Sequence, residues 1–163
     1  MRGNKSPARA ICQGALIAAM YVALTYMAAQ FGLSSGVIQL RLSEALCVMP
    51  IFTAAAIPGL FLGCLLANAL TGAVVLDVVM GSIATLIGAV GTYLLRRHPR
   101  LALLPPILAN IIIVPWVLRY GYGMPDAIWY MMGTVGAGEV LSVGVLGSLL
   151  YLSLRRHAAR LAC

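Results

Sequence analysis

Three of the four carboxylates in this chain lie within or beside long apolar stretches. They are Glu44, Asp77 and Glu139, whereas Asp126 lies in a polar segment. A charged side chain at the centre of a bilayer costs roughly 2.5 kcal/mol or more, so it usually faces a cavity, a partner group or a ligand. We therefore expect these three carboxylates to mark the functional part of the molecule.

Glu139 is the leading candidate for a binding residue. It lies several positions inside a span rich in Gly and Val, and no basic residue is near it in the sequence. A buried carboxylate without a partner is strongly unfavourable. The partner of Glu139 must therefore come from another helix or from a ligand.

Glu44 and Asp77 each have a structural interpretation beside the functional one. Arg41 precedes Glu44 by three residues, so on a helix the two would share a face and form a capping salt bridge. Alternatively, this segment folds into the mouth of a site and one of the two charges reaches a ligand. Asp77 lies where a span begins, and there it could either cap backbone N–H groups or bind a ligand.

Three further side chains could complete such a site. Asn68 and Asn110 offer both donors and acceptors inside their spans, although hydrogen bonding between helices would also explain them. Trp116 belongs to a cluster of aromatic residues typical of the membrane interface, and it could also stack on a flat ligand.

The composition identifies the class of protein that must hold these residues in place. The chain is 62% apolar and 9% charged, and its mean hydropathy is +0.99. A soluble domain of this size could not bury so much apolar surface. We predict one all-α integral membrane domain, a bundle of six transmembrane helices at roughly 10–31, 44–57, 59–76, 77–95, 101–120 and 127–154. Pro58-Gly59 is expected to form the turn between the second and third spans.

The net charge of +7 has a distribution typical of membrane orientation. Nine of the eleven basic residues form three clusters between or outside the spans, namely Arg2, Lys5 and Arg9; Arg96, Arg97 and Arg100; and Arg155, Arg156 and Arg160. With six spans, all three clusters lie on one side. The positive-inside rule then places both termini in the cytoplasm. Nucleic-acid binding is not expected.

Motifs for catalysis or cofactor binding are weak. The four cysteines lack metal-ligand spacing, and both histidines lie in arginine clusters. We predict no cofactor and no metal site. In the first span Ala15, Ala19 and Ala23 recur every fourth residue, a pattern that lets helices approach closely in lipid. Packing within the bundle and docking of a second protein both fit this stripe.

The whole chain resembles the QueT family of substrate-binding (S) components of energy-coupling factor (ECF) transporters. The resemblance is carried by the runs QLRLSEALCVMPIFTAAAIPGLFLGCLLANAL, LDVVMGSIATLIGAVGTYLLRR and LALLPPILANIIIVPWVL. It implies the six-helix S-component fold and capture of a queuosine precursor, a deazaguanine base such as preQ1, preQ0 or queuine. It also implies a place in a prokaryotic plasma membrane, where Ala15, Ala19 and Ala23 dock a membrane-embedded coupling (T) component and two cytoplasmic ATPases supply energy.

A deazaguanine presents an N1–H and an exocyclic amine on one edge, and a single carboxylate can accept hydrogen bonds from both. We therefore expect Glu139 and Glu44 to bind the ligand, with Asn68, Asp77, Asn110, Arg41 and Trp116 around them. Three alternatives stay open at this point. They are an S component for another vitamin-like molecule, a small membrane enzyme that uses Asp77 and Glu139 as an acid–base pair, and an assembly protein that uses only the alanine stripe.

Overall fold

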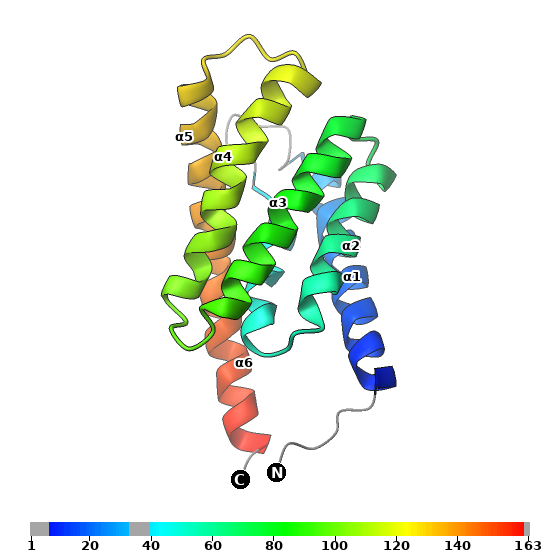
Figure 1. Cartoon of the computed structure of the whole chain (residues 1–163), viewed down its shortest axis with the longest axis vertical. Coiled ribbons are helices and arrows are strands. Elements are labelled where there is room, and N and C mark those ends of the chain that lie inside the picture. Colours follow the sequence, from blue (N-terminus) through cyan, green and yellow to red (C-terminus); the bar gives the residue numbers. More distant parts are fainter. Residues whose placement is uncertain (1–6, 33–39, 162–163) are drawn as a thin grey trace.

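The computed structural model describes residues 7–32 and 40–161, and over these residues the chain is helical without strands. The α-helices are α1 (Pro7–Gln30), α2 (Ala56–Leu70), α3 (Val75–Leu94), α4 (Leu104–Gly121), α5 (Ile128–Glu139) and α6 (Gly147–Leu161). Three further elements are the 3₁₀ helices η1 (Leu42–Ile51) and η2 (Leu101–Leu103) and the π-helix η3 (Val140–Leu146). Figure 1 shows the long helices running side by side as a bundle. The prediction of an all-α fold is confirmed.

Four helical segments are long and apolar enough to cross a membrane. They are Pro7–Gln30, Val75–Leu94, Leu101–Gly121 and Ile128–Arg156, the last of which joins α5, η3 and most of α6. The other two predicted spans correspond to η1 and α2, which are apolar but shorter. Such short helices suit a bundle in which they pack against neighbours and end beside a cavity.

The second predicted span, 44–57, extends beyond the helix observed there. The 3₁₀ helix η1 ends at Ile51, and α2 begins at Ala56. Pro58-Gly59 therefore lies in the first turn of α2 and does not form the connecting turn. Proline is tolerated there because the first N–H groups of a helix have no partner within the helix.

Glycines allow the helices to approach closely. The contact between α1 and α2 is made at Gly14 and Gly59, where an added Cβ on Gly59 would lie 2.6 Å from the carbonyl oxygen of Gly14. The contact between α3 and α4 is similar, because a Cβ on Gly88 would lie 2.6 Å from the Cα of Pro106. These contacts follow the small-residue packing typical of helices in lipid.

One face of α3 is buried along its whole length. It carries residues at helical spacing, in the order Asp77, Gly81, Thr85, Gly88 and Thr92. Small and hydroxyl side chains on this face bring α3 close to α2, α4 and η1. The Thr92 hydroxyl donates to the carbonyl oxygen of Ala102, 2.8 Å away, and so ties α3 to η2.

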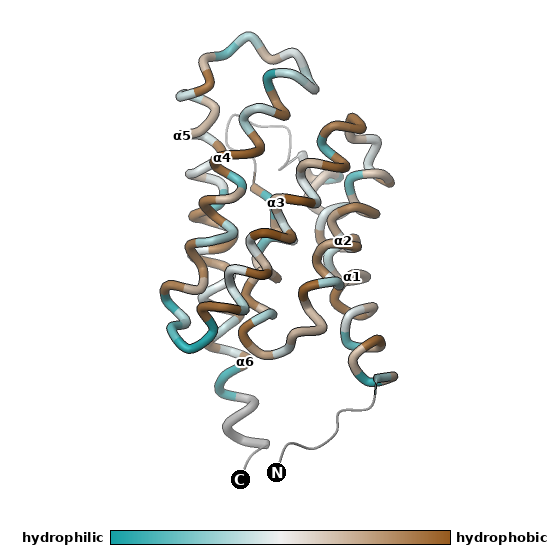
Figure 2. The backbone as a smooth tube through the Cα atoms, in the orientation of Figure 1, coloured by the Kyte–Doolittle hydropathy of each residue, from teal (hydrophilic) through white to brown (hydrophobic). Residues whose placement is uncertain are grey.

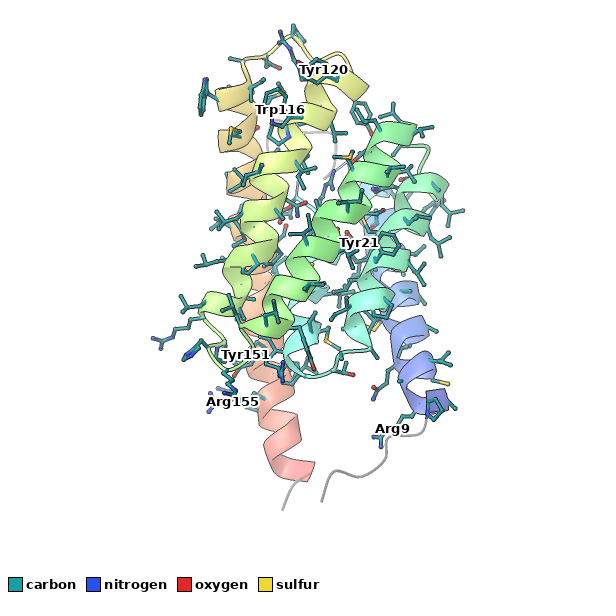
Figure 3. All side chains as sticks on the ribbon, in the orientation of Figure 1. Arg9, Tyr21, Trp116, Tyr120, Tyr151 and Arg155 are labelled. Atoms are coloured by element: carbon teal, nitrogen blue, oxygen red, sulfur yellow. The ribbon has the colours of Figure 1, made fainter. Side chains whose placement is uncertain are left out.

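The two ends of the bundle differ in character (Figure 2). The start of α1, the connection between α3 and α4, and the lower part of α6 lie at the same end, where Figure 3 labels Arg9 and Arg155. The α4–α5 connection lies at the opposite end. This placement agrees with basic clusters on one side, while their cytoplasmic location stays a prediction.

The contact between Gly14 and Gly59 gives a stability prediction. We expect Gly59→Ala to lower the free energy of unfolding by about 1–3 kcal/mol, because the new methyl group would press on a backbone atom that cannot rotate away. Gly133→Ala is the matched control, since a Cβ at Gly133 meets no atom within 4 Å. Thermal unfolding in detergent would compare the two variants, and equal melting temperatures would contradict the packing described for α1 and α2.

Candidate functional site

A cavity of about 520 Å³ opens at the end of the bundle opposite the arginine clusters. Its wall is formed by α1, the start of η1, the end of α2, the start of α3 and the end of α4. Its lining residues are Tyr21, Thr25, Ala28, Ala29, Arg41, Ser43, Asn68, Thr71, Gly72, Ala73, Asp77, Leu118, Tyr122 and Met124. Of the predicted site residues, Arg41, Asn68 and Asp77 therefore line one common cavity.

Asp77 links three elements at the rim of this cavity. Its Oδ2 accepts a hydrogen bond of 2.9 Å from the Tyr122 hydroxyl, and its Oδ1 lies 3.8 Å from Nη2 of Arg41. Asp77 is the third residue of α3, and Val74 occupies the capping position. Burial, followed by the neighbouring Asp77 carboxylate, raises the pKa of Tyr122, so this phenol stays protonated as the donor.

Arg41 thus forms its ion pair with Asp77 of another helix. A capping salt bridge to Glu44 was the structural interpretation of Arg41, and among the described residues Arg41 makes no such pair with Glu44. The functional interpretation, in which the segment before η1 folds into the mouth of the site, agrees with Arg41 and Ser43 lining the cavity. Residues 33–39, which precede this segment, lie outside the described residues.

Asn68 supports the same wall from α2. Its Nδ2 donates to the backbone oxygen of Asp77 at 3.3 Å and contacts the Cys64 sulfur at 3.6 Å. Gly81 leaves the room for this arrangement, because a Cβ there would lie 2.9 Å from Oδ1 of Asp77 and 3.1 Å from Nδ2 of Asn68.

Glu44 is fully buried next to the cavity wall. Its Oε1 accepts hydrogen bonds from the Tyr21 hydroxyl at 2.5 Å and from Thr85 at 3.4 Å, and its Oε2 accepts from the Cys47 thiol at 3.0 Å. The 3₁₀ geometry of η1 has three residues per turn, so Cys47 stands directly above Glu44. Tyr21 belongs to the cavity lining, and it therefore connects the cavity to this carboxylate.

Glu139, Asn110 and Ser142 form a second buried group, between α4, α5 and η3. The Glu139 carboxyl interacts electrostatically with Glu44 and Arg41, and it lies close to the Asn110 side chain. The Asn110 amide is close enough to the Glu139 carboxyl to interact with it, but no well-aligned hydrogen bond reaches the buried atoms Oε2 of Glu139, Oγ of Ser142, and Oδ1 and Nδ2 of Asn110. Most buried polar atoms in proteins are paired, so such a group is where a ligand or water would bind. The π-helix η3 begins directly after Glu139, and π-helical turns are frequent at functional sites.

Trp116 and the alanine stripe lie away from the cavity. Trp116 is 47% exposed, between the buried Pro115 and Val117, and its ring stacks on Tyr120 with centroids 6.0 Å apart. Figure 3 shows both aromatic side chains near the α4–α5 end. Ala15, Ala19 and Ala23 are all exposed on α1.

Sequence reasoning missed several residues of the site. Tyr21 and Tyr122 donate to the two carboxylates nearest the cavity. The Cys47 thiol also donates to Glu44. A hydroxyl in the middle of an apolar span was the available signal for Tyr21, since a buried tyrosine hydroxyl needs a partner. Among residues 7–32 and 40–161, no group of three or more His, Cys, Asp or Glu is placed to hold a metal ion.

Tyr21 tests the importance of the Glu44 network. We expect Tyr21→Phe to lower the free energy of unfolding by about 1–3 kcal/mol, because it removes a donor from a buried carboxylate. Tyr26→Phe is the control, since Tyr26 is on the same helix but exposed. Thermal unfolding in detergent is the measurement, and equal losses for both variants would contradict a special role of the Tyr21 hydroxyl.

Comparison with known proteins identifies the family of the chain. No curated protein sequence and no solved structure matches it. The family model described as "QueT transporter" matches residues 11–156, which is most of the chain and includes every cavity-lining residue. The resemblance noted from the sequence motifs is thereby confirmed, and this chain belongs to the QueT transporter family.

Proposed function

We propose that this protein is the substrate-binding subunit of an ATP-driven ECF importer and captures a deazaguanine precursor of queuosine in the cavity beside Asp77. Membership of the QueT transporter family supports a membrane transport role over an enzymatic one. The observation that carries the proposal is a cavity of about 520 Å³ with carboxylates in its wall and beside it. This volume falls in the range of roughly 300–1,000 Å³ found for small-molecule sites.

The charge balance around the cavity favours a cationic ligand that is rich in hydrogen-bond donors. Glu44, Asp77 and Glu139 face a single guanidinium, that of Arg41, which lies within electrostatic range of all three. Three carboxyl groups beside one guanidinium cannot all be ionised in a site of low dielectric unless a ligand supplies positive charge, because an uncompensated buried charge is costly. An aminomethyl deazaguanine would supply a positive charge together with N–H donors.

Asp77 and Glu139 lie at different depths, so they would bind different parts of such a ligand. Asp77 lines the cavity directly, and its buried Oδ1 accepts no hydrogen bond. Glu139, with Asn110 and Ser142, lies deeper and keeps four polar atoms without a well-aligned hydrogen bond. Pairing these atoms with a ligand would recover the free energy that an unsatisfied buried polar group costs, about 1–3 kcal/mol for each group.

Binding by the isolated protein is the direct test. We expect selective binding of aminomethyl deazaguanine over guanine and riboflavin in detergent solution. Asp77→Asn and Glu139→Gln should each weaken this binding by about 10- to 100-fold, because each removes a charged hydrogen-bond partner worth about 1.5–3 kcal/mol. Isothermal titration calorimetry on monodisperse samples would measure the affinities.

Asp126→Asn is the matched control, since it removes the same charge from an exposed loop residue. It should leave the affinity within about twofold of the unchanged protein, as surface charges distant from a site contribute little. Tight binding of riboflavin without deazaguanine binding would favour an S component for another small molecule. Absence of deazaguanine binding by a folded sample would contradict the proposed substrate.

The exposed alanine stripe is proposed as the docking surface for the membrane-embedded coupling (T) component, which would associate with two ATPases. α1 fully buries only Gly14, Ile17, Tyr21 and Ala28, and the face that carries the alanine stripe is exposed within the described chain. Large apolar side chains on that surface include Leu16 and Met27, both more than half exposed. Small residues between them would let a partner helix approach closely.

We expect Ala19→Leu to weaken association with the coupling component by at least about tenfold, because the larger side chain would hold the two helices apart. Ligand binding by the isolated subunit should stay unchanged. Ala137→Leu, at an exposed position of α5, is the control. Co-purification of the tagged subunit with its coupling component would report the association, and a loss shared by both variants would argue against α1 as the docking helix.

A further inference from the structure

A second cavity, of about 290 Å³, lies near the arginine-rich end of the bundle. It is formed by the first turns of α1, the connection between η1 and α2, and the end of α3. Its polar lining consists of Arg9 and Gln13 on α1, Thr53 in the connection, and Tyr93 and Arg96 at the end of α3. No step of the proposed substrate capture uses this cavity.

The positive charge of this cavity is not balanced by any carboxylate side chain of the protein. Glu44, Asp77 and Glu139 belong to the other site, and Asp126 lies in the α4–α5 connection at the opposite end. Arg97 and Arg100 follow Arg96 in the α3–α4 connection but do not line the cavity. Two arginines at one cavity without a carboxylate partner favour an anionic ligand.

The side chains are already arranged for such a ligand. The guanidinium of Arg96 lies 4.1 Å from the centre of the Tyr93 ring, and its Nη1 donates to the Tyr93 carbonyl oxygen at 3.0 Å. These two contacts use one face and one N–H group of a side chain that has five N–H donors. The Thr53 hydroxyl donates to Oε1 of Gln13 at 3.1 Å, which fixes the orientation of an amide that carries further N–H donors.

Apolar side chains flank the cavity on both of its helices. Ile11 is 71% exposed and stands between the lining residues Ala10 and Gln13, and Leu94 is 71% exposed and stands between Tyr93 and Arg96. A free phosphate ion would gain nothing from these side chains. A phospholipid would place its phosphate at the arginines and its acyl chains along the apolar surfaces of α1 and α3.

We propose that this cavity binds the phosphate group of an anionic phospholipid. Basic pockets between transmembrane helices are a recognised site for acidic lipid headgroups, and each Lys or Arg near the membrane surface contributes roughly fivefold to the affinity. Arg9 and Arg96 together would then favour phosphatidylglycerol over neutral phosphatidylcholine by on the order of 20-fold. The site is independent of the substrate cavity and of the proposed ligand.

Native mass spectrometry of the detergent-solubilised protein tests this inference. The protein is titrated with phosphatidylglycerol or with phosphatidylcholine of the same acyl chains. We expect one phosphatidylglycerol to bind on the order of 20-fold more tightly. The double variant Arg9→Gln with Arg96→Gln should lose most of this preference, whereas Arg97→Gln with Arg100→Gln, which removes the same charge from exposed residues outside the cavity, should keep it within about threefold.

Several results would overturn the proposal. Equal affinity for the two lipids, or an equal loss in both double variants, would overturn the proposal in favour of a diffuse charge effect. Displacement of the lipid by millimolar inorganic phosphate would overturn the lipid assignment and indicate a free anion as the ligand. If the Arg9 and Arg96 double variant does not fold, each single variant should show a loss of about fivefold, and unchanged binding in both would overturn the site.

Discussion

The burial of Glu44 is the constraint on which the rest of the structure depends. A carboxylate without solvent exposure must be surrounded by donors, because an unpaired charge in an apolar interior is prohibitively costly. The donors come from α1, α3 and η1 itself, as Tyr21, Thr85 and Cys47. Their convergence requires three helices to meet closely, which the glycines of α2 and the small residues on the inner face of α3 allow. The short 3₁₀ helix is the element that brings carboxylate and thiol onto one face.

The remaining embedded carboxylates contrast with Glu44. Its oxygens are satisfied by the protein, whereas Oδ1 of Asp77 and Oε2 of Glu139 accept no hydrogen bond. A satisfied network gives a rigid frame, since buried polar groups with partners fix a single arrangement of the helices. Unsatisfied groups held by such a frame do not need to reorganise when a ligand arrives, which lowers the cost of binding. In the proposed function, Glu44 would therefore belong to the framework, and Asp77 and Glu139 would bind the ligand.

The sequence could predict the helical membrane bundle and the embedding of three carboxylates in it, because hydropathy and rare charges are local signals. It could not predict that Arg41 pairs with Asp77 instead of Glu44, or that Tyr21 and Tyr122 complete the site, because these pairs are 23 to 45 residues apart and depend on tertiary packing. Trp116 shows a further limit. Successive helical residues differ by about 100° in direction, so Trp116 lies outside although Pro115 and Val117 are buried.

α1 connects the two proposed activities of the protein. One of its faces supplies Tyr21 and Thr25 to the cavity, and Tyr21 also holds Glu44. Its exposed face carries Ala15, Ala19 and Ala23, where the coupling component is proposed to dock. A partner on that face would therefore be one helix diameter, about 10 Å, from the ligand. Any shift of α1 caused by docking would move the Tyr21 hydroxyl relative to Glu44. If docking and ligand binding favour different positions of α1, each must change the affinity of the other by the same factor.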